Sequence, residues 1–152
     1  MTILNVFDPK TTEAIFKRLE NLNPNIKPQW GKMNAAQMVA HLNVTYDLAF
    51  GKTIANHSFF QKLILKLFVK GIVVGDKPYP KNSRTGADFI IADVRDFEKE
   101  KAIFIEYIKT VESKGASFFE AKENPAFGVL TSKEWNNQFY KHIDHHFQQF
   151  GI

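Results

Sequence analysis

The sequence predicts an all-α protein, because the same three signals recur along its 152 residues. Residues that commonly cap helices stand before apolar stretches, the apolar residues repeat at three- and four-residue spacing, and glycine or proline follows. Strand signals are weak, and the short stretch ADFIIADV at 87–94 is the best candidate. We therefore expect a helical bundle in one domain over residues 1–152.

The first two helices begin with short polar side chains. Asp8 is expected to cap the first helix, and Asn23-Pro24 to end it. The second helix is expected over 34–51, where Asn34 and Gln37 have the spacing of a capping box and glycine stands at the end.

The third helix is expected over 58–75, followed by a loop to about residue 92. It is the most apolar segment of the chain, but Lys62, Lys66 and Lys70 form one charged stripe along it. A membrane span would have to bury all three ammonium groups, which costs much free energy. We expect an amphipathic helix and no membrane partner.

Two more helices complete the chain. One is expected over 96–115, from an aspartate cap to a glycine. The stretch NPAFGVL at 124–130 is expected to be a loop. The last helix opens with the capping box formed by Thr131 and Glu134 and runs to Gly151.

Composition excludes several kinds of protein. The chain contains no cysteine, which excludes disulfides, thiolate metal sites and a cysteine nucleophile. The N-terminal stretch lacks the pattern of a signal peptide, so we expect a cytoplasmic location. The net charge is +4, but few of the basic residues are arginines and no basic cluster with interleaved aromatics occurs, so nucleic acid is not an expected partner.

Histidines are concentrated near the C-terminus, in YKHIDHHFQQFG at 140–151. At 3.6 residues per turn, His142 and His146 fall in the apolar stripe of the last helix, whereas His145 falls at its edge. In the second helix, His41 likewise lies at the centre of the apolar face. A single buried histidine is ordinarily hydrogen-bonded, and a pair four apart also occurs on wet helix surfaces. The three together predict a site for one divalent metal.

Two glutamines are expected to line or support this site. Gln37 lies one turn before His41, and Gln149 lies three residues after His146. Each also has a simpler interpretation, since Gln37 suits the helix cap and Gln149 can face solvent near a helix end. Oxygen ligands are a further alternative, and the candidates for them are Glu120, Glu123 and Glu134.

Three stretches resemble the DinB/YfiT-like superfamily of proposed metalloenzymes, and in particular a branch described as a domain of unknown function. These are WGKMNAAQMVAHL at 30–42, FGVLTSKEW at 127–135 and the C-terminal histidine stretch. The resemblance covers nearly the whole chain. The chain departs from the family pattern at Asn124, a position where histidine is common in the family.

The resemblance implies a four-helix bundle with up-down-down-up connections. The long crossover at 51–95 would carry the extra helix, on the outside of the bundle or as the face of a homodimer. It also implies that His41, His142 and His146 are the metal ligands. Beside these ligands, His145, Gln37 and Gln149 are our own candidates for neighbours that support the site.

Nitrogen-only ligation suits Zn or Ni better than Mg or Ca. Such an ion keeps its charge and can acidify a bound water or thiol. The leading hypothesis is a metal-dependent hydrolase or transferase of the DinB type, acting on a small molecule with water or an external low-molecular-weight thiol. The alternatives are a non-catalytic module that binds metal or ligand, and a metal-free protein with a polar core. With the ordinary histidine pKa, metal binding is expected to weaken below about pH 6.5.

Overall fold

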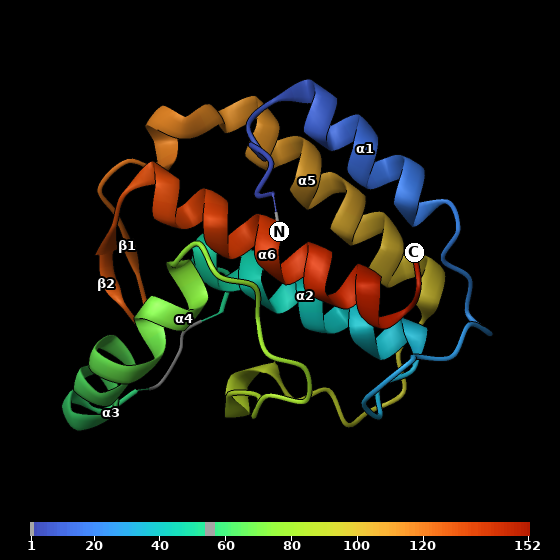
Figure 1. Cartoon of the computed structure of the whole chain (residues 1–152), viewed down its shortest axis with the longest axis horizontal. Coiled ribbons are helices and arrows are strands. Elements are labelled where there is room, and N and C mark those ends of the chain that lie inside the picture. The colour runs from blue at the N-terminus through green and yellow to red at the C-terminus, as the bar shows by residue number, and fades with distance from the viewer. Residues whose placement is uncertain (1, 54–56) are drawn as a thin grey trace.

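The helices that carry the histidines, α2 (Ala35–Ala49) and α6 (Ser132–Gln149), lie side by side. Both pack on α5 (Phe97–Phe119), and α1 (Pro9–Leu19) packs on another side of α5 (Figure 1). The computed structural model describes residues 2–53 and 57–152. The chain is mostly helical, so the all-α prediction is confirmed.

Each helix start expected from the sequence is capped by the expected residue. Asp8 accepts a hydrogen bond from the backbone of Lys10. Capping boxes join side chain to backbone in both directions at the start of three helices, formed by the pairs Asn34 and Gln37, Ser58 and Gln61, and Thr131 and Glu134. Local sequence therefore determines where these helices begin.

Stacked aromatic rings fill the space between the helices. Tyr46 of α2 stacks on Phe139 of α6 at a centroid distance of 5.0 Å, and its ring meets Phe104 of α5 edge to face. Phe119 contacts both Trp135 and Phe139. All these side chains are buried. Removing so much aromatic surface from water is the main force that holds α2, α5 and α6 together.

Two helix ends differ from the prediction. The first helix ends at Leu19 rather than at Asn23-Pro24, because a hydrogen bond from the Leu22 backbone to the Leu19 carbonyl tightens the chain and buries Leu22. Gly115 adopts a φ of 69°, which interrupts α5 as predicted. A further helical turn then continues to Phe119, and it places that ring in the core.

The third predicted helix is divided. It consists of α3 (Phe59–Ile64), a π-helical turn (Leu65–Val69) and α4 (Lys70–Val74). The predicted loop begins after α4. Helix α4 itself packs on α6. Figure 1 shows α3 standing away from the other helices. Within the described residues, no helix is both long enough and apolar enough to cross a membrane.

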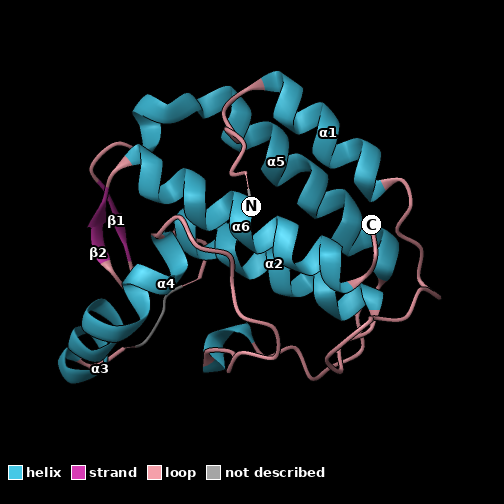
Figure 2. Cartoon of the chain, viewed as in Figure 1, coloured by secondary structure: helices cyan, strands magenta, loops and turns pink. Residues whose placement is uncertain are grey.

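The strand prediction was wrong in both places. Residues 87–94 contain a 3-10 helix (Ala87–Phe89) and no strand, and a small antiparallel hairpin instead joins β1 (Lys122–Asn124) to β2 (Gly128–Leu130) (Figure 2). The buried Asn124 side chain accepts hydrogen bonds from the Ala126 and Phe127 backbones, which closes the hairpin turn. Strands of three residues are too short for an alternating pattern to reveal them.

Lys141 stabilises the junction between α4 and α6. Its side chain is fully buried, and the ammonium group donates to the carbonyls of Ile72, Val73 and Gly75 at 2.7, 3.1 and 2.6 Å. Burial lowers the pKa of Lys141 to about 8, so the group is still protonated at neutral pH. It thus satisfies carbonyls at the C-terminal end of α4 that have no partner within the helix.

Lys141→Met is therefore expected to destabilise the protein by about 2–4 kcal/mol, since buried carbonyls lose a charged donor. Urea unfolding monitored by circular dichroism measures the change. Lys109→Met, at a largely exposed lysine of α5, is the control and should change stability by less than about 0.5 kcal/mol. Equal effects of the two substitutions would contradict this role of Lys141.

Candidate metal centre

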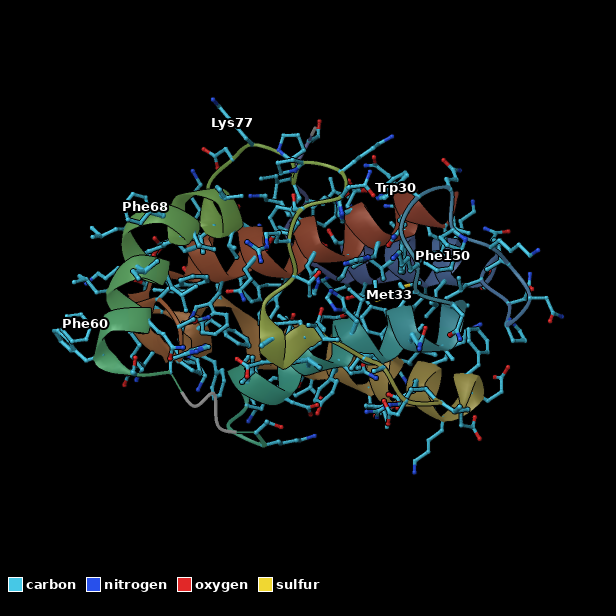
Figure 3. All side chains as sticks on the ribbon, turned by 90° about the horizontal axis from the view of Figure 1, so that it is seen from below. Trp30, Met33, Phe60, Phe68, Lys77 and Phe150 are labelled. Carbon is cyan, nitrogen blue, oxygen red and sulfur yellow. The ribbon has the colours of Figure 1, made fainter. Side chains whose placement is uncertain are left out.

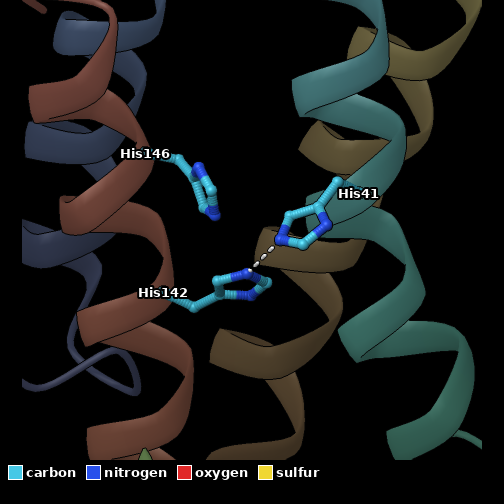
Figure 4. A group of neighbouring side chains, drawn as sticks. All are labelled: His41, His142 and His146. Carbon is cyan, nitrogen blue, oxygen red and sulfur yellow. Dashed lines mark hydrogen bonds between the residues drawn. The ribbon is translucent and has the colours of Figure 1, made fainter. Parts of the chain in front are cut away.

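Three buried histidines from two helices meet in the space between α2 and α6. His41 comes from α2, and His142 and His146 come from successive turns of α6 (Figure 4). One ring nitrogen of each lies within 4.8 Å of the others. Nε2 of His41 and Nε2 of His142 are 2.8 Å apart. The exposed fractions of His41, His142 and His146 are 4%, 9% and 7%.

The other nitrogen of each ring is held by the surrounding protein. Nδ1 of His41 donates to the carbonyl of Phe89 at 2.8 Å. Nδ1 of His146 lies 2.7 Å from Oε1 of Gln149, and Nδ1 of His142 lies 2.8 Å from the Thr45 hydroxyl. Each Nε2 consequently faces the common centre. In metal sites, a protein group that bonds to one ring nitrogen of a histidine orients the other nitrogen toward the ion in the same way.

These partners determine where the protons are. A carbonyl only accepts, so His41 carries its proton on Nδ1 and offers a lone pair on Nε2. Gln149 donates its amide to the Trp30 carbonyl, so its oxygen faces His146 and the same tautomer follows there. Among the described residues, Nε2 of His146 has no hydrogen-bond partner. Two lone pairs are therefore directed into the centre.

Thr45 gives His142 two neutral arrangements, because a hydroxyl can donate or accept. When Thr45 donates to Nδ1, Nε2 of His142 carries the proton and donates to His41. When Thr45 accepts from Nδ1, Nε2 of His142 offers a third lone pair. The second arrangement fits a divalent cation held by three neutral imidazoles.

Burial keeps the three rings neutral. It lowers the pKa of His41 and lowers that of His142 well below the ordinary histidine value, and the imidazoles beside His142 lower it further. Burial, together with the neighbouring His41, lowers the pKa of His146 to about 3. Since only neutral imidazole ligates a metal, the protein presents its histidines in the ligating form at neutral pH.

The other predicted residues occupy different positions. His145 is partly exposed beside the three histidines, between the rings of Trp30 and Tyr79 at centroid distances of 5.9 and 5.7 Å. Gln149 is buried against His146. Gln37 instead accepts from the Asn34 backbone, in the helix cap that was its simpler interpretation.

The structure does not bring the glutamates to this centre. Glu120 accepts from the Ser132 backbone, and Glu134 forms its capping box and an ion pair with Lys70 at 2.9 Å. Glu123 is exposed in the hairpin. The residues that could hold a metal within the described chain are the three histidines.

Two contacts at the centre were not predicted from the sequence. The Phe89 carbonyl belongs to the crossover loop, and a backbone acceptor leaves no mark in the identity of its residue. Thr45 lies one turn after His41 on the same helix face, so its position in the sequence could have predicted that it contacts the cluster.

The fold and the site together define an all-α protein with a buried cluster of three histidines that could hold a metal ion. The chain belongs to the family described as a protein of unknown function, DUF1569, whose model matches residues 6–151. No curated protein and no solved structure matches the chain.

Gln149→Ala is expected to weaken metal binding about 10- to 100-fold, because His146 loses the partner that orients its ring. Titration calorimetry with Zn²⁺ measures the affinity. The neighbouring Gln148 is exposed and bonds to Asp144, so Gln148→Ala is the matched control and should bind like the wild type. An unchanged affinity of Gln149→Ala would show that Gln149 does not support the ligand.

Proposed function

We propose that the chain is a metal-dependent enzyme of the DinB type. In this proposal α1, α2, α5 and α6 form a DinB-like four-helix bundle with up-down-down-up connections, and residues 1–152 are one domain. His41, His142 and His146 hold one divalent ion, Zn or Ni. The observation that carries the proposal is the convergence of three buried imidazole nitrogens whose opposite nitrogens are all held by protein groups.

The donor set supports this choice of metal. Neutral nitrogen ligands suit Zn and Ni, whereas Mg and Ca prefer oxygen. Three neutral ligands leave the full charge of the ion, which when bound can acidify a water or a thiol. The chain has no cysteine, so a thiol must come from a low-molecular-weight compound. The substrate is then a small molecule that undergoes hydrolysis or transfer.

In this proposal a substrate approaches the cluster on the side of His145, whose ring lies beside those of Trp30 and Tyr79. His145 is the most exposed of the four neighbouring histidines, and its ring contacts His146 edge to face at 5.1 Å. In this proposal His145 and the two aromatic rings contact the substrate, and the histidines of α2 and α6 hold the ion.

The burial of the cluster favours a second candidate, a module whose metal serves folding or ligand capture. All three histidines are nearly inaccessible, and the Phe89 carbonyl of the crossover loop bonds directly to His41. A catalytic ion needs a position open to substrate, whereas a structural ion does not.

Two measurements separate these functions. Elemental analysis of protein purified without a histidine tag should find about one Zn or Ni per chain, and its absence after reconstitution would contradict both candidates. Conjugation of a small thiol with electrophilic substrates, and hydrolysis of ester substrates, are then assayed with loaded and chelated protein. Metal-dependent turnover supports the enzyme, and binding without turnover supports the module.

A further inference from the structure

The connection between α1 and α2 is bonded to the end of α6 through Gln149. The backbone N–H of Gln29 donates to the Gln149 carbonyl at 2.7 Å, and the Gln149 side-chain amide donates to the Trp30 carbonyl, also at 2.7 Å. Figure 3 shows Trp30 and Phe150 toward the same end of the molecule, opposite Phe60. The connection thus holds residue 149 through both its backbone and its side chain.

Gly31 leaves the space in which the Gln149 side chain reaches the Trp30 carbonyl. Its backbone has a φ of 84°, in the left-handed region that residues with a Cβ atom rarely adopt. A Cβ atom at this position would lie 2.5 Å from Nε2 of Gln149, which is closer than non-bonded atoms approach one another. Any larger residue at position 31 would therefore displace the Gln149 amide.

The Gln149 amide cannot move without losing a hydrogen bond. Its side chain is buried, its nitrogen donates to the Trp30 carbonyl, and its oxygen lies 2.7 Å from Nδ1 of His146. A buried polar group that loses its partner is destabilised, so the three residues are held as one unit. The ring of Trp30 lies beside that of His145. One glutamine therefore joins a metal ligand to the aromatic residue that, in the proposed function, contacts the substrate.

We propose, on the basis of the proposed metal site, that Gly31 is a positioning residue of the metal centre. It acts through Gln149, which holds the ring of His146 and the backbone of Trp30 in one arrangement. Gly31 contributes no ligand, and its role is to leave room for the Gln149 amide. This role belongs to the beginning of the stretch WGKMNAAQMVAHL at 30–42, in which His41 is the residue that lies in the cluster.

Titration calorimetry with Zn²⁺ tests the role of Gly31. Gly31→Ala should weaken metal binding about 10- to 100-fold, the range expected when a ligating histidine loses its partner. Gly128→Ala is the matched control, because Gly128 has a φ of 75° but a Cβ atom there would meet nothing within 4 Å. It introduces similar backbone strain without displacing Gln149, so it should bind Zn²⁺ like the wild type. Equal affinities of the two variants would overturn the proposal.

A double variant shows whether Gly31 acts through Gln149. Gln149→Ala removes the amide that a Cβ atom at position 31 would meet, so adding Gly31→Ala should weaken binding by no more than about two- to threefold further. If the two losses multiply instead, Gly31 acts by another route and the proposal is wrong. Circular dichroism shows which variants are folded. If Gly31→Ala alone is unfolded, the double variant should still fold and bind like Gln149→Ala, because the new methyl group then has room.

The ring of His146 can also be observed without metal. In ¹⁵N NMR spectra of the metal-free wild type, His146 should carry its proton on Nδ1, because Gln149 accepts it. Gly31→Ala should shift both ring nitrogens toward the averaged values of two exchanging tautomers, whereas Gly128→Ala should not. Comparison with His146→Gln identifies the signals.

The NMR result separates this proposal from the proposed function. His146 signals in Gly31→Ala that match the wild type would overturn the positioning role of Gly31, whether or not the protein binds Zn²⁺. A wild type that binds no Zn²⁺ while Gly31→Ala shows the shift would contradict the proposed metal function and support the positioning of the His146 ring by Gly31.

Discussion

Replacing any one of His41, His142 and His146 by alanine is expected to abolish stoichiometric metal binding. The three nitrogens surround one position, and two imidazoles alone leave a divalent ion under-coordinated. A metal that binds only the folded state adds about 4 kcal/mol of stability when it is a thousandfold above its Kd. The wild type should show this gain in urea unfolding, and each variant should show almost none.

His145→Ala is the control for this experiment, because His145 has the same chemistry and stands in the same helix but outside the cluster. It should keep stoichiometric binding. If His145→Ala loses the ion while His142→Ala retains it, the assignment of ligands is wrong. Unfolding of the metal-free variants shows separately whether the alanine substitutions leave the fold intact.

The metal-free protein is expected to lose stability steeply between pH 6.5 and 5. Burial lowers the pKa of all three histidines in the folded state, so the unfolded chain binds protons in this range that the folded chain does not. The free energy of unfolding therefore falls as the pH falls. The slope is about 1.4 kcal/mol per pH unit for each ring that stays neutral in the folded protein and is protonated in the unfolded chain. Three such rings give up to about 4 kcal/mol per pH unit.

The triple replacement of His41, His142 and His146 by glutamine removes these groups and should remove most of this slope. Urea unfolding at several pH values compares the two proteins. A wild-type slope no greater than that of the triple variant would show that the histidines do not titrate in this way. The range lies above the ordinary pKa values of Asp and Glu, so carboxylates contribute little to it.

The same burial changes the expected pH range of metal binding. The ordinary histidine pKa places the loss of metal below about pH 6.5. The folded protein keeps His146 neutral down to a pKa of about 3, so protons compete with the metal less than in an exposed site. We expect the ion to be retained below pH 6 and released together with acid unfolding. Dialysis at each pH followed by elemental analysis measures this.

Much of the helical structure could be predicted because its signals are local. A cap such as Asn34 with Gln37 bonds within four residues of itself, so the same contacts appear in the sequence and in the structure. The hairpin at β1 and β2 and the 3-10 helix are too short to show a period. The π-helical turn that divides the third predicted helix has no recognised signal in the sequence.

By itself, the sequence determined that the protein is helical and that His41, His142 and His146 lie on inward helix faces. These properties follow from 3.6-residue periodicity, which each helix carries alone. Only the tertiary structure decided which neighbours hold the rings, because the Phe89 carbonyl and Gln149 reach the histidines through the crossover loop and the end of α6. Only tertiary packing buries the imidazoles and lowers their pKa values, since desolvation depends on all the atoms around a group. It also left the large apolar side chains within residues 59–72 exposed, because the apolar face of a helix is buried only when another surface covers it.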